Sequence, residues 1–277
     1  MKLLHYFILF PLNKLSHKVI CKLKGRWYEF FFNLYTLIFN YEGKVRFDGK
    51  FYFIDSKDKN PWRFYHEKIG LSCYKKGLIS RAESLSQLYL LNNISFNNED
   101  IIIDCGANNG DFYLIFTKKI HYIGVEPSPI EFSNLENNIK NQTLINKALW
   151  KDKKEKMDFY IKSYTGKSGG DSSLIEVKNY EQKIKIDTTT LDEIIEPLNK
   201  NVKLVKIEGE GAEPEILEGL SKHLRKVEYI TVDAGFERGI NQESTLVPCI
   251  NYLTKNGFKL IDYSKKRTSV LFKNINI

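Results

Sequence analysis

An acid and two glycines follow a short apolar run near the middle of the chain. Ile101–Ile103 leads into Asp104, Gly106 and Gly110, with the spacing D-x-G-x-x-x-G. A run this short and β-branched is typical of a parallel strand that is buried on both faces. Glycine after such a strand lets the backbone turn sharply and approach a ligand closely. We expect a helix over Phe112–Lys119, whose first turn would offer N–H groups to an anionic ligand group.

The spacing distinguishes this loop from two common phosphate-binding loops. It lacks the G-x-G-x-x-G pattern of dinucleotide-binding folds and the G-x-x-x-x-G-K-[ST] pattern of a P-loop. An acid at the strand end would repel a pyrophosphate, but it suits a ligand that carries an amino group. S-adenosylmethionine (SAM) carries a sulfonium, an ammonium and a carboxylate, so we expect Asp104 on its ammonium side. The alternative is a plain strand–helix–strand unit whose glycines only make a turn.

A second acid strengthens the case for a ligand that contains a nucleoside. The apolar run Tyr122–Val125 ends in Glu126. An acid at the end of the second strand commonly binds ribose hydroxyls in nucleotide-binding α/β folds. Glu126 is therefore expected to bind the ribose of SAM.

The composition is that of a globular protein, and we expect it in the cytoplasm. The 277 residues suffice for a large core, and 27% charged with 42% hydrophobic residues is ordinary for a soluble chain. Four cysteines and five histidines are scattered without regular spacing. Neither a disulfide framework nor a metal site is expected from them.

The net charge of +8 is concentrated in residues 1–40, where six Lys and Arg residues accompany Glu29 as the single acid. Apolar side chains share one helical face over Leu12–Leu23, lysines share another over Lys14–Lys22, and the aromatic run Trp27–Tyr35 follows. Neither apolar stretch reaches the roughly 18–20 residues of a spanning helix, and no cleavage site for a signal peptide follows. The segment either lies on an anionic membrane surface, at its cytoplasmic face, or forms a cap on the main domain or a second subunit.

The chain divides into an N-terminal extension (1–99) and an α/β domain (100–277). The extension contains a hairpin over Val45–Ile54 and a helix over Arg81–Leu91. Further strands are expected over Thr143–Ala148, Val202–Ile207, Val227–Val232, Phe258–Tyr263 and Ser269–Phe272. Further helices are expected over Ser128–Ile139, Pro214–Leu224 and Leu246–Lys255. A hairpin is expected over Met157–Lys162 and Lys183–Thr188, with its strands joined by the loop Gly166–Ser173. A mostly parallel sheet that ends in an antiparallel hairpin is typical of SAM-dependent methyltransferases.

Several ordered motifs resemble those of the FkbM-type methyltransferases. Lys206–Gly219 resembles that family's K-I-D-V-E-G-A-E…L-x-G signature, with Glu208 and Gly209 in place of its usual aspartate and valine. Its D-x-G-A-N-x-G, E-P-x-P and T-L-D motifs, and the segment after its third strand, correspond here to Asp104–Gly110, Glu126–Pro129, Thr190–Asp192 and Asn146–Leu149. The resemblance implies a class I methyltransferase fold, SAM as cofactor and O-methylation as the commonest reaction. The cofactor-binding residues would be Asp104, Gly106, Ala107, Asn108, Gly110, Glu126, Pro127 and Ala148.

Acids at two adjacent strand ends are the expected catalytic residues. Methyl transfer is an in-line displacement that depends on orientation, and a carboxylate would help to remove the proton of an alcohol. Glu208 and Asp233 end the fourth and fifth strands, where open α/β sheets bind ligands. The pair could instead bind a divalent cation, but without a third clear ligand we expect no metal.

The acceptor is expected to be a sugar hydroxyl in a cell-surface glycan or its precursor, because the chain resembles family members with the forms E-G-E-G-A-E-P-E and D-x-x-x-E-R-G. Glu210 and Arg238 would contact it, Arg238 by orienting an anionic group unless it forms a surface salt bridge. Two rival functions are a non-catalytic scaffold for glycan assembly and a nucleic-acid methyltransferase. The intact glycine loop argues against the scaffold, and the N-terminal position of the basic charge, with no N-P-P-[FYW] motif, argues against nucleic acid as partner.

Overall fold

The computed structural model describes residues 10–55, 60–162, 172–264 and 267–277. The chain folds as two compact units, the first ending at Arg81 and the second beginning at Ala82. Residues 82–99 therefore belong with the sheet unit, and the boundary lies earlier than residue 99. The reason is burial: Tyr89 and Leu91 are buried, and the Thr231 hydroxyl donates to the backbone oxygen of Tyr89 at 2.9 Å.

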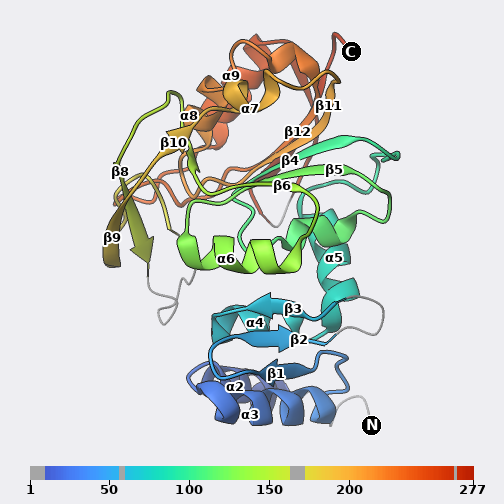
Figure 1. Cartoon of the computed structure of the whole chain (residues 1–277), viewed down its shortest axis with the longest axis vertical. Helices are drawn as coiled ribbons and strands as arrows, with labels where there is room; N and C mark the ends of the chain where they lie inside the picture. The colour runs from blue at the N-terminus through green and yellow to red at the C-terminus, as the bar shows by residue number, and fades with distance from the viewer. Residues whose placement is uncertain (1–9, 56–59, 163–171, 265–266) are drawn as a thin grey trace. The chain divides into compact units, whose positions relative to one another are not determined.

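The first unit combines helices with a small antiparallel sheet (Figure 1). Its elements are α2 (Phe10–Ile20), α3 (Gly25–Ile38), β1 (Val45–Phe47), β2 (Tyr52–Ile54), β3 (Trp62–Phe64), α4 (Glu67–Tyr74) and the start of α5 (Gly77–Leu88), with strand order β1-β2-β3. The β1–β2 hairpin is confirmed. The third strand was missed because three residues are too few to show a period of two. No described helix is long and apolar enough to cross a membrane.

The second unit is built on one seven-stranded sheet with the order β13-β14-β12-β11-β4-β5-β6. These strands are β4 (Ile101–Cys105), β5 (His121–Val125), β6 (Thr143–Ile145), β11 (Val202–Ile207), β12 (Val227–Asp233), β13 (Phe258–Tyr263) and β14 (Ser269–Asn274). Neighbours from β12 to β6 pair in parallel, whereas β14 is antiparallel to both β12 and β13. The class I methyltransferase fold is thereby confirmed, including its terminal antiparallel hairpin.

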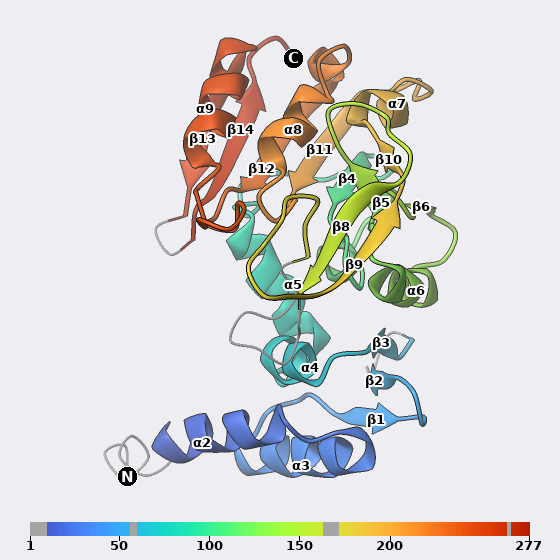
Figure 2. The ribbon, with the colours of Figure 1, turned by 90° about the vertical axis from the view of Figure 1, so that its left-hand side faces the viewer.

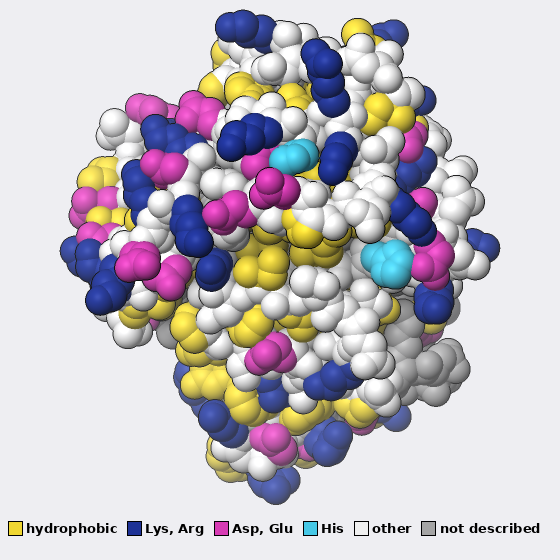
Figure 3. Space-filling view, turned by 45° about the horizontal axis from the view of Figure 1, so that its top comes forward, with side chains coloured by type: hydrophobic (Ala, Val, Ile, Leu, Met, Phe, Trp, Pro, Cys, Tyr) yellow, Lys and Arg dark blue, Asp and Glu magenta, His cyan; other side chains and the backbone are white. Residues whose placement is uncertain are grey.

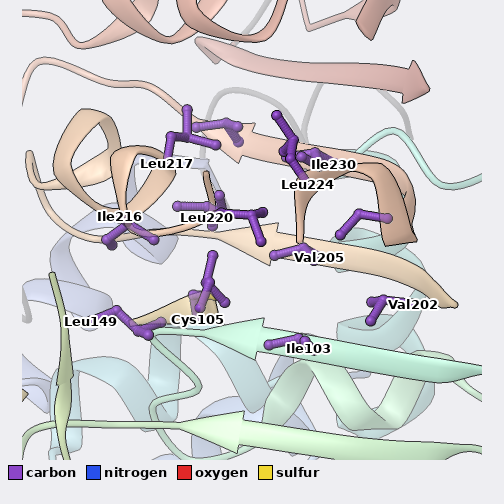
Figure 4. Close-up of a cluster of buried hydrophobic side chains, with 14 of the residues drawn as sticks. Ile103, Cys105, Leu149, Val202, Val205, Ile216, Leu217, Leu220, Leu224 and Ile230 are labelled. Atoms are coloured by element: carbon purple, nitrogen blue, oxygen red, sulfur yellow. The ribbon is translucent and has the colours of Figure 1, made fainter. Parts of the chain in front are cut away.

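Helices cover both faces of this sheet (Figure 1). The helices α7 (Leu191–Ile195), α8 (Glu213–Glu218) and α9 (Leu246–Lys255) lie on one face, and α6 (Pro129–Asn138) lies on the other. Alternate residues of β4 and β11, such as Ile103, Cys105 and Val205, point into the apolar cluster under the first group of helices (Figure 4). Cys105 is fully buried there as a small core residue. The opposite alternation points Asp104 and Lys206 to the other face, which matters for the site.

Three predicted elements differ from the structure. The helix over Phe112–Lys119 is only a 3-10 helix, Asp111–Ile115, after which Phe116 is extended, because aromatic and β-branched residues are weak helix formers. The helix from Pro214 ends at Glu218. The strand expected over Thr143–Ala148 is divided into β6 and β7 (Ala148–Leu149). Of these two, β7 pairs with β10 (Thr188–Thr189) outside the main sheet.

Beside the sheet, β8 (Met157–Lys162) and β9 (Tyr180–Ile186) form the predicted antiparallel hairpin as a separate two-stranded ribbon (Figure 2). Most of the expected Gly166–Ser173 loop lies outside the described residues.

Candidate active site

The glycine loop joins the ends of three neighbouring strands. Gly106 and Gly110 have φ angles of 77° and 88°, which favour glycine. The backbone N–H groups of Gly106 and Ala107 both donate to the oxygen of Val125, at 2.9 and 3.0 Å, which ties the loop to the end of β5. A Cβ on Gly106 would lie 2.2 Å from the carbonyl oxygen of Glu208. Glycine at 106 therefore permits the close approach of β4 and the end of β11.

A buried ion pair lies beneath this loop. The Asp104 carboxylate is fully buried, with Oδ1 3.0 Å from Nζ of Lys206, and Oδ2 accepts the Tyr122 hydroxyl proton at 2.5 Å. Lys206 is 2% exposed and also donates to the backbone oxygen of Gly106 at 2.8 Å. Burial disfavours its ammonium, but Asp104 and Glu208 outweigh burial and raise the pKa of Lys206. Asp104 thus has protein partners within the fold, and its expected contact with the ammonium of SAM stays a prediction.

Glu208 continues this network instead of standing as a free base. Its Oε2 accepts the Tyr89 hydroxyl at 2.6 Å and lies 3.1 Å from Nζ of Lys206, while Oε1 lies 3.6 Å from Arg267. Burial opposes ionisation, yet Lys206, the Tyr89 hydrogen bond and Arg267 lower the pKa of Glu208. A carboxylate with a lowered pKa is a weak proton acceptor. The arrangement holds Glu208 ionised within this network, and its expected role as the base stays a prediction.

Asp233 lies at the other end of the same chain of charges. It ends β12, is 3% exposed, and its Oδ2 lies 2.6 Å from Nη2 of Arg267. Burial, followed by the charge of Glu208, raises the pKa of Asp233 against the opposing effect of Arg267. The two residues expected to be catalytic are therefore brought together, linked through one guanidinium.

Glu126 occupies the end of β5 as the sequence suggested. It is 6% exposed, and its two oxygens accept the N–H groups of Asn108 and Ser128, each at 2.8 Å. Burial and the nearby Glu131 raise the pKa of Glu126 to about 8, although both hydrogen bonds lower it. Each carboxylate oxygen has a second lone pair, so the group can still accept hydrogen bonds from two ribose hydroxyls.

Among the remaining expected cofactor residues, Asn108 donates its N–H to Glu126 and Pro127 follows Glu126 in the sequence. Asn108 has a φ of 50°, and the Asn146 side chain donates to the backbone oxygens of Glu126 and Pro127, at 2.9 and 3.2 Å. Ala148 is buried in β7, where its N–H donates to the oxygen of Asp187.

Of the two residues expected to contact the acceptor, Glu210 precedes α8 and Arg238 follows β12. Arg238 forms a two-pronged ion pair with Glu215, at 2.6 and 2.8 Å, and donates to the backbone oxygen of Gly211. It therefore forms the salt bridge that was the alternative to an anionic acceptor. Glu210 lies in the preceding loop with a φ of 50°, and its backbone oxygen accepts the Ser173 hydroxyl.

An open cleft of about 690 Å³ lies beside Asp233. Asp233 pairs with Ser269, and both residues line the cleft. The cleft therefore lies at the carboxyl edge of the sheet, where the parallel strands end and where α/β folds bind ligands. Its lining includes Asp233, Gly235, Phe236, Glu237, Tyr263 and Arg267. The lining acids Asp233 and Glu237 accompany Arg267, and Glu208 lies 3.6 Å from the same guanidinium, so acidic side chains outnumber cations at this edge of the cleft, which suits a sulfonium. No group of three or more His, Cys, Asp and Glu in the described part of the chain could hold a metal ion.

Sequence reasoning missed three contributors to this network. Lys206 carried a signal, because a lysine inside a buried parallel strand must find a partner. Arg267 belonged to a predicted turn, and Tyr89 lies 119 residues before its partner Glu208, so neither position indicated its contact.

Loss of the Lys206 ammonium should destabilise the second unit strongly. Lys206→Met leaves Asp104 buried without its cation, so we expect the free energy of unfolding to fall by about 3–5 kcal/mol. Lys203→Met, on the same strand, removes only a partly exposed pair with Glu228 and should cost about 1 kcal/mol or less. Urea unfolding of both variants measures the difference. Equal losses would mean that the buried pair has no special role.

The comparisons with known proteins fit this geometry. The family described as the methyltransferase FkbM domain matches residues 104–260. No curated protein matches the chain significantly. Among solved structures, TrmK of M. capricolum with S-adenosylhomocysteine is 12% identical over 69% of this chain and 68% of that chain, with a TM-score of 0.38.

The N-terminal domain of human METTL16 is also 12% identical, over 71% and 69% of the two chains, with a TM-score of 0.38. Precorrin-6y C5,15-methyltransferase of Geobacter metallireducens is 11% identical over 70% and 85%, with a TM-score of 0.37. Likeness this low indicates no substrate for this chain. The family match, in contrast, covers more than half of the residues, so this protein belongs to the FkbM methyltransferase family and is a SAM-dependent methyltransferase.

Proposed function

We propose that this enzyme methylates a hydroxyl of a sugar, in a cell-surface glycan or its precursor. The observation that carries the proposal is the make-up of the cleft. Phe236 and Tyr263 are 64% and 58% exposed and line it together with carboxylates and Arg267. A sugar presents apolar C–H faces and a rim of hydroxyls, so exposed rings beside charged hydrogen-bonding groups match both parts of it.

The residues around the glycine loop fit SAM. When bound, SAM supplies a methyl group made electrophilic by its sulfonium. Glu126 would accept the ribose hydroxyls, and the loop from Gly106 to Gly110 would lie against the amino-acid end. The excess of carboxylates favours the sulfonium, and Lys206 holds the loop in place through the oxygen of Gly106. This chain's own part in catalysis is then orientation and removal of one proton.

A nucleic-acid acceptor has less support. Binding to a phosphate backbone needs a surface rich in Lys and Arg. On the face seen in Figure 3, Lys and Arg side chains are interspersed with Asp and Glu side chains and form no continuous basic surface there among the described residues. We also propose that the reaction takes place in the cytoplasm, because the methyl donor SAM is available there.

A direct test supplies the full chain with SAM and simple methyl glycosides of hexoses and deoxyhexoses. We expect a base-stable methyl ether on at least one glycoside, identified by mass spectrometry and NMR. At pH 9, above the raised pKa of about 8 of Glu126, Glu126→Gln should weaken SAM binding about tenfold or more in calorimetry, because a carboxylate acceptor of charge-assisted hydrogen bonds is lost. Glu99→Gln, at an exposed carboxylate, should leave binding unchanged. Methylation of RNA alone, with every glycoside unmodified, would contradict the proposal.

A further inference from the structure

We propose that Glu237 is the general base that takes the proton of the acceptor hydroxyl. The inference rests on the proposed O-methylation and assigns its proton transfer. Glu237 is half-buried and lines the cleft with Asp233 and Arg267. It comes from the segment after β12, on the carboxyl edge of the sheet.

The neighbouring Gly235 holds space for this carboxylate. A Cβ on Gly235 would lie 2.3 and 2.5 Å from Oε2 and Oε1 of Glu237. The Glu237 side chain therefore folds back over the backbone at Gly235, which keeps its carboxylate beside Asp233 at the cleft wall. The absence of a side chain at 235 is what permits this position.

The other acids near the cleft have partners that restrict them. Glu208 contacts Lys206 and Tyr89, and Asp233 is paired with Arg267. Glu213 accepts the N–H groups of Gly209 and Gly211 and the Thr245 hydroxyl, and so supports the loop. Among the described residues, in contrast, Glu237 forms no hydrogen bond or ion pair.

The electrostatic surroundings suit a base that works near neutral pH. Burial raises the pKa of Glu237 to about 7, helped by Asp233 (β12), Glu213 (α8) and Glu208 (the end of β11) and opposed by Arg267 (the β13–β14 turn). The Tyr263 hydroxyl is the other titratable group of the cleft lining. A general base is most effective when its pKa lies close to the working pH.

The step balances as follows. The acceptor oxygen forms its bond to the methyl carbon while the bond from that carbon to sulfur breaks, and the sulfur keeps the electron pair. The hydroxyl proton passes to the Glu237 carboxylate. The products are a methyl ether, neutral S-adenosylhomocysteine and a protonated Glu237, which returns its proton to water.

The test compares Glu237→Gln with Glu243→Gln, an exposed acid in the same segment, using the methyl glycoside that is methylated best. In the wild type, kcat/KM should fall about tenfold per pH unit below pH 7 and level off above it, because the base must be deprotonated. Glu237→Gln should lose this dependence and about 10²- to 10⁴-fold in kcat, a far larger loss than any in SAM affinity. Glu237→Asp should recover part of the rate, and Glu243→Gln should resemble the wild type.

A second readout does not need the acceptor. In NMR titration of the free protein with labelled glutamate carboxyls, the signal that vanishes in Glu237→Gln should titrate near pH 7. A pH profile that survives in Glu237→Gln, or a titration near the ordinary glutamate value, would overturn the assignment. Failure of all glycosides would instead contradict the proposed function.

An independent observation in the first unit carries a second inference. Helix α3 buries Tyr28, Phe32 and Tyr35 on one side. Its other side exposes six apolar residues, Trp27, Phe30, Phe31, Leu34, Leu37 and Ile38, of which Trp27 and Leu37 are 68% and 77% exposed. At about 100° per residue these six fall within one third of the helix circumference. We call them the exposed face of α3.

Basic residues lie before this face in the sequence and at the start of α3. Lys18, Lys22, Lys24 and Arg26 are exposed, and Glu29 is the single acid between residues 15 and 38. Lys24 and Arg26 remain 74% and 84% exposed despite long ion pairs of 3.7 and 3.9 Å. We infer that the exposed face of α3 binds the surface of an anionic phospholipid membrane, with its rings in the interface and its cations on lipid phosphates. Symmetric pairing with a second copy would bring like charges together.

Vesicles of phosphatidylcholine with and without phosphatidylglycerol test this with the full chain. Trp27 is the exposed tryptophan, since Trp62 is buried and the Trp150 ring nitrogen is inaccessible, so it reports contact with brominated lipid. We expect binding to the anionic vesicles that weakens with salt. Phe30→Ser with Leu37→Ser should reduce it about tenfold or more, whereas Ile79→Ser, equally exposed elsewhere in the first unit, should not.

Binding that the double variant leaves unchanged would overturn the inference. The inference would also be overturned if the wild type bound neither kind of vesicle and sedimented as a dimer, and if the double variant sedimented as a monomer.

Discussion

The pairing of Lys206 with Asp104 is the interaction on which the site depends. An ammonium inside a parallel sheet is costly unless it is fully paired, and here one ammonium contacts two carboxylates and the backbone oxygen of Gly106. It thereby ties the ends of β4 and β11 together under the glycine loop. Gly106 completes the arrangement, because any side chain would collide with the oxygen of Glu208. The glycine loop is thus held by charge and by close backbone contact.

The same network gives the acids at the carboxyl edge of the sheet different pKa values. Glu208 is held ionised by its partners, whereas burial and neighbouring acids raise the pKa values of Asp233 and Glu237. Glu208 can therefore stabilise positive charge while Glu237 exchanges a proton near neutral pH. Arg267 joins Glu208 to Asp233 and so connects the network beneath the glycine loop with the cleft. The buried Lys206 and the partly exposed Arg267 thereby help to determine which of these acids stays ionised and which can take up a proton.

The sequence predicted the sheet well because buried strands such as Ile101–Cys105 and Val202–Ile207 carry continuous apolar runs. It located Glu126 and Asp233 because both end such strands. Glu237 appeared in the sequence only as part of the D-x-x-x-E-R-G motif, with no role assigned to it. Its proposed role depends on the ion pairs that the neighbouring Glu208 and Asp233 form in the fold, which the sequence does not reveal. The contacts of Tyr89 and Arg267 are set by packing between distant segments, and no local pattern encodes them. The expected helix after Gly110 failed because aromatic residues there pack as a short turn.

The most direct measurement is a crystal structure of the complex with S-adenosylhomocysteine and a methylated glycoside. The account predicts ribose hydroxyls on Glu126, the amino-acid end against the loop from Gly106 to Gly110, and the sulfur facing the cleft. The acceptor oxygen should lie within hydrogen-bonding distance of Glu237. A cofactor bound with its sulfur turned away from the cleft, or an acceptor oxygen that contacts Glu208 and leaves Glu237 in water, would contradict it.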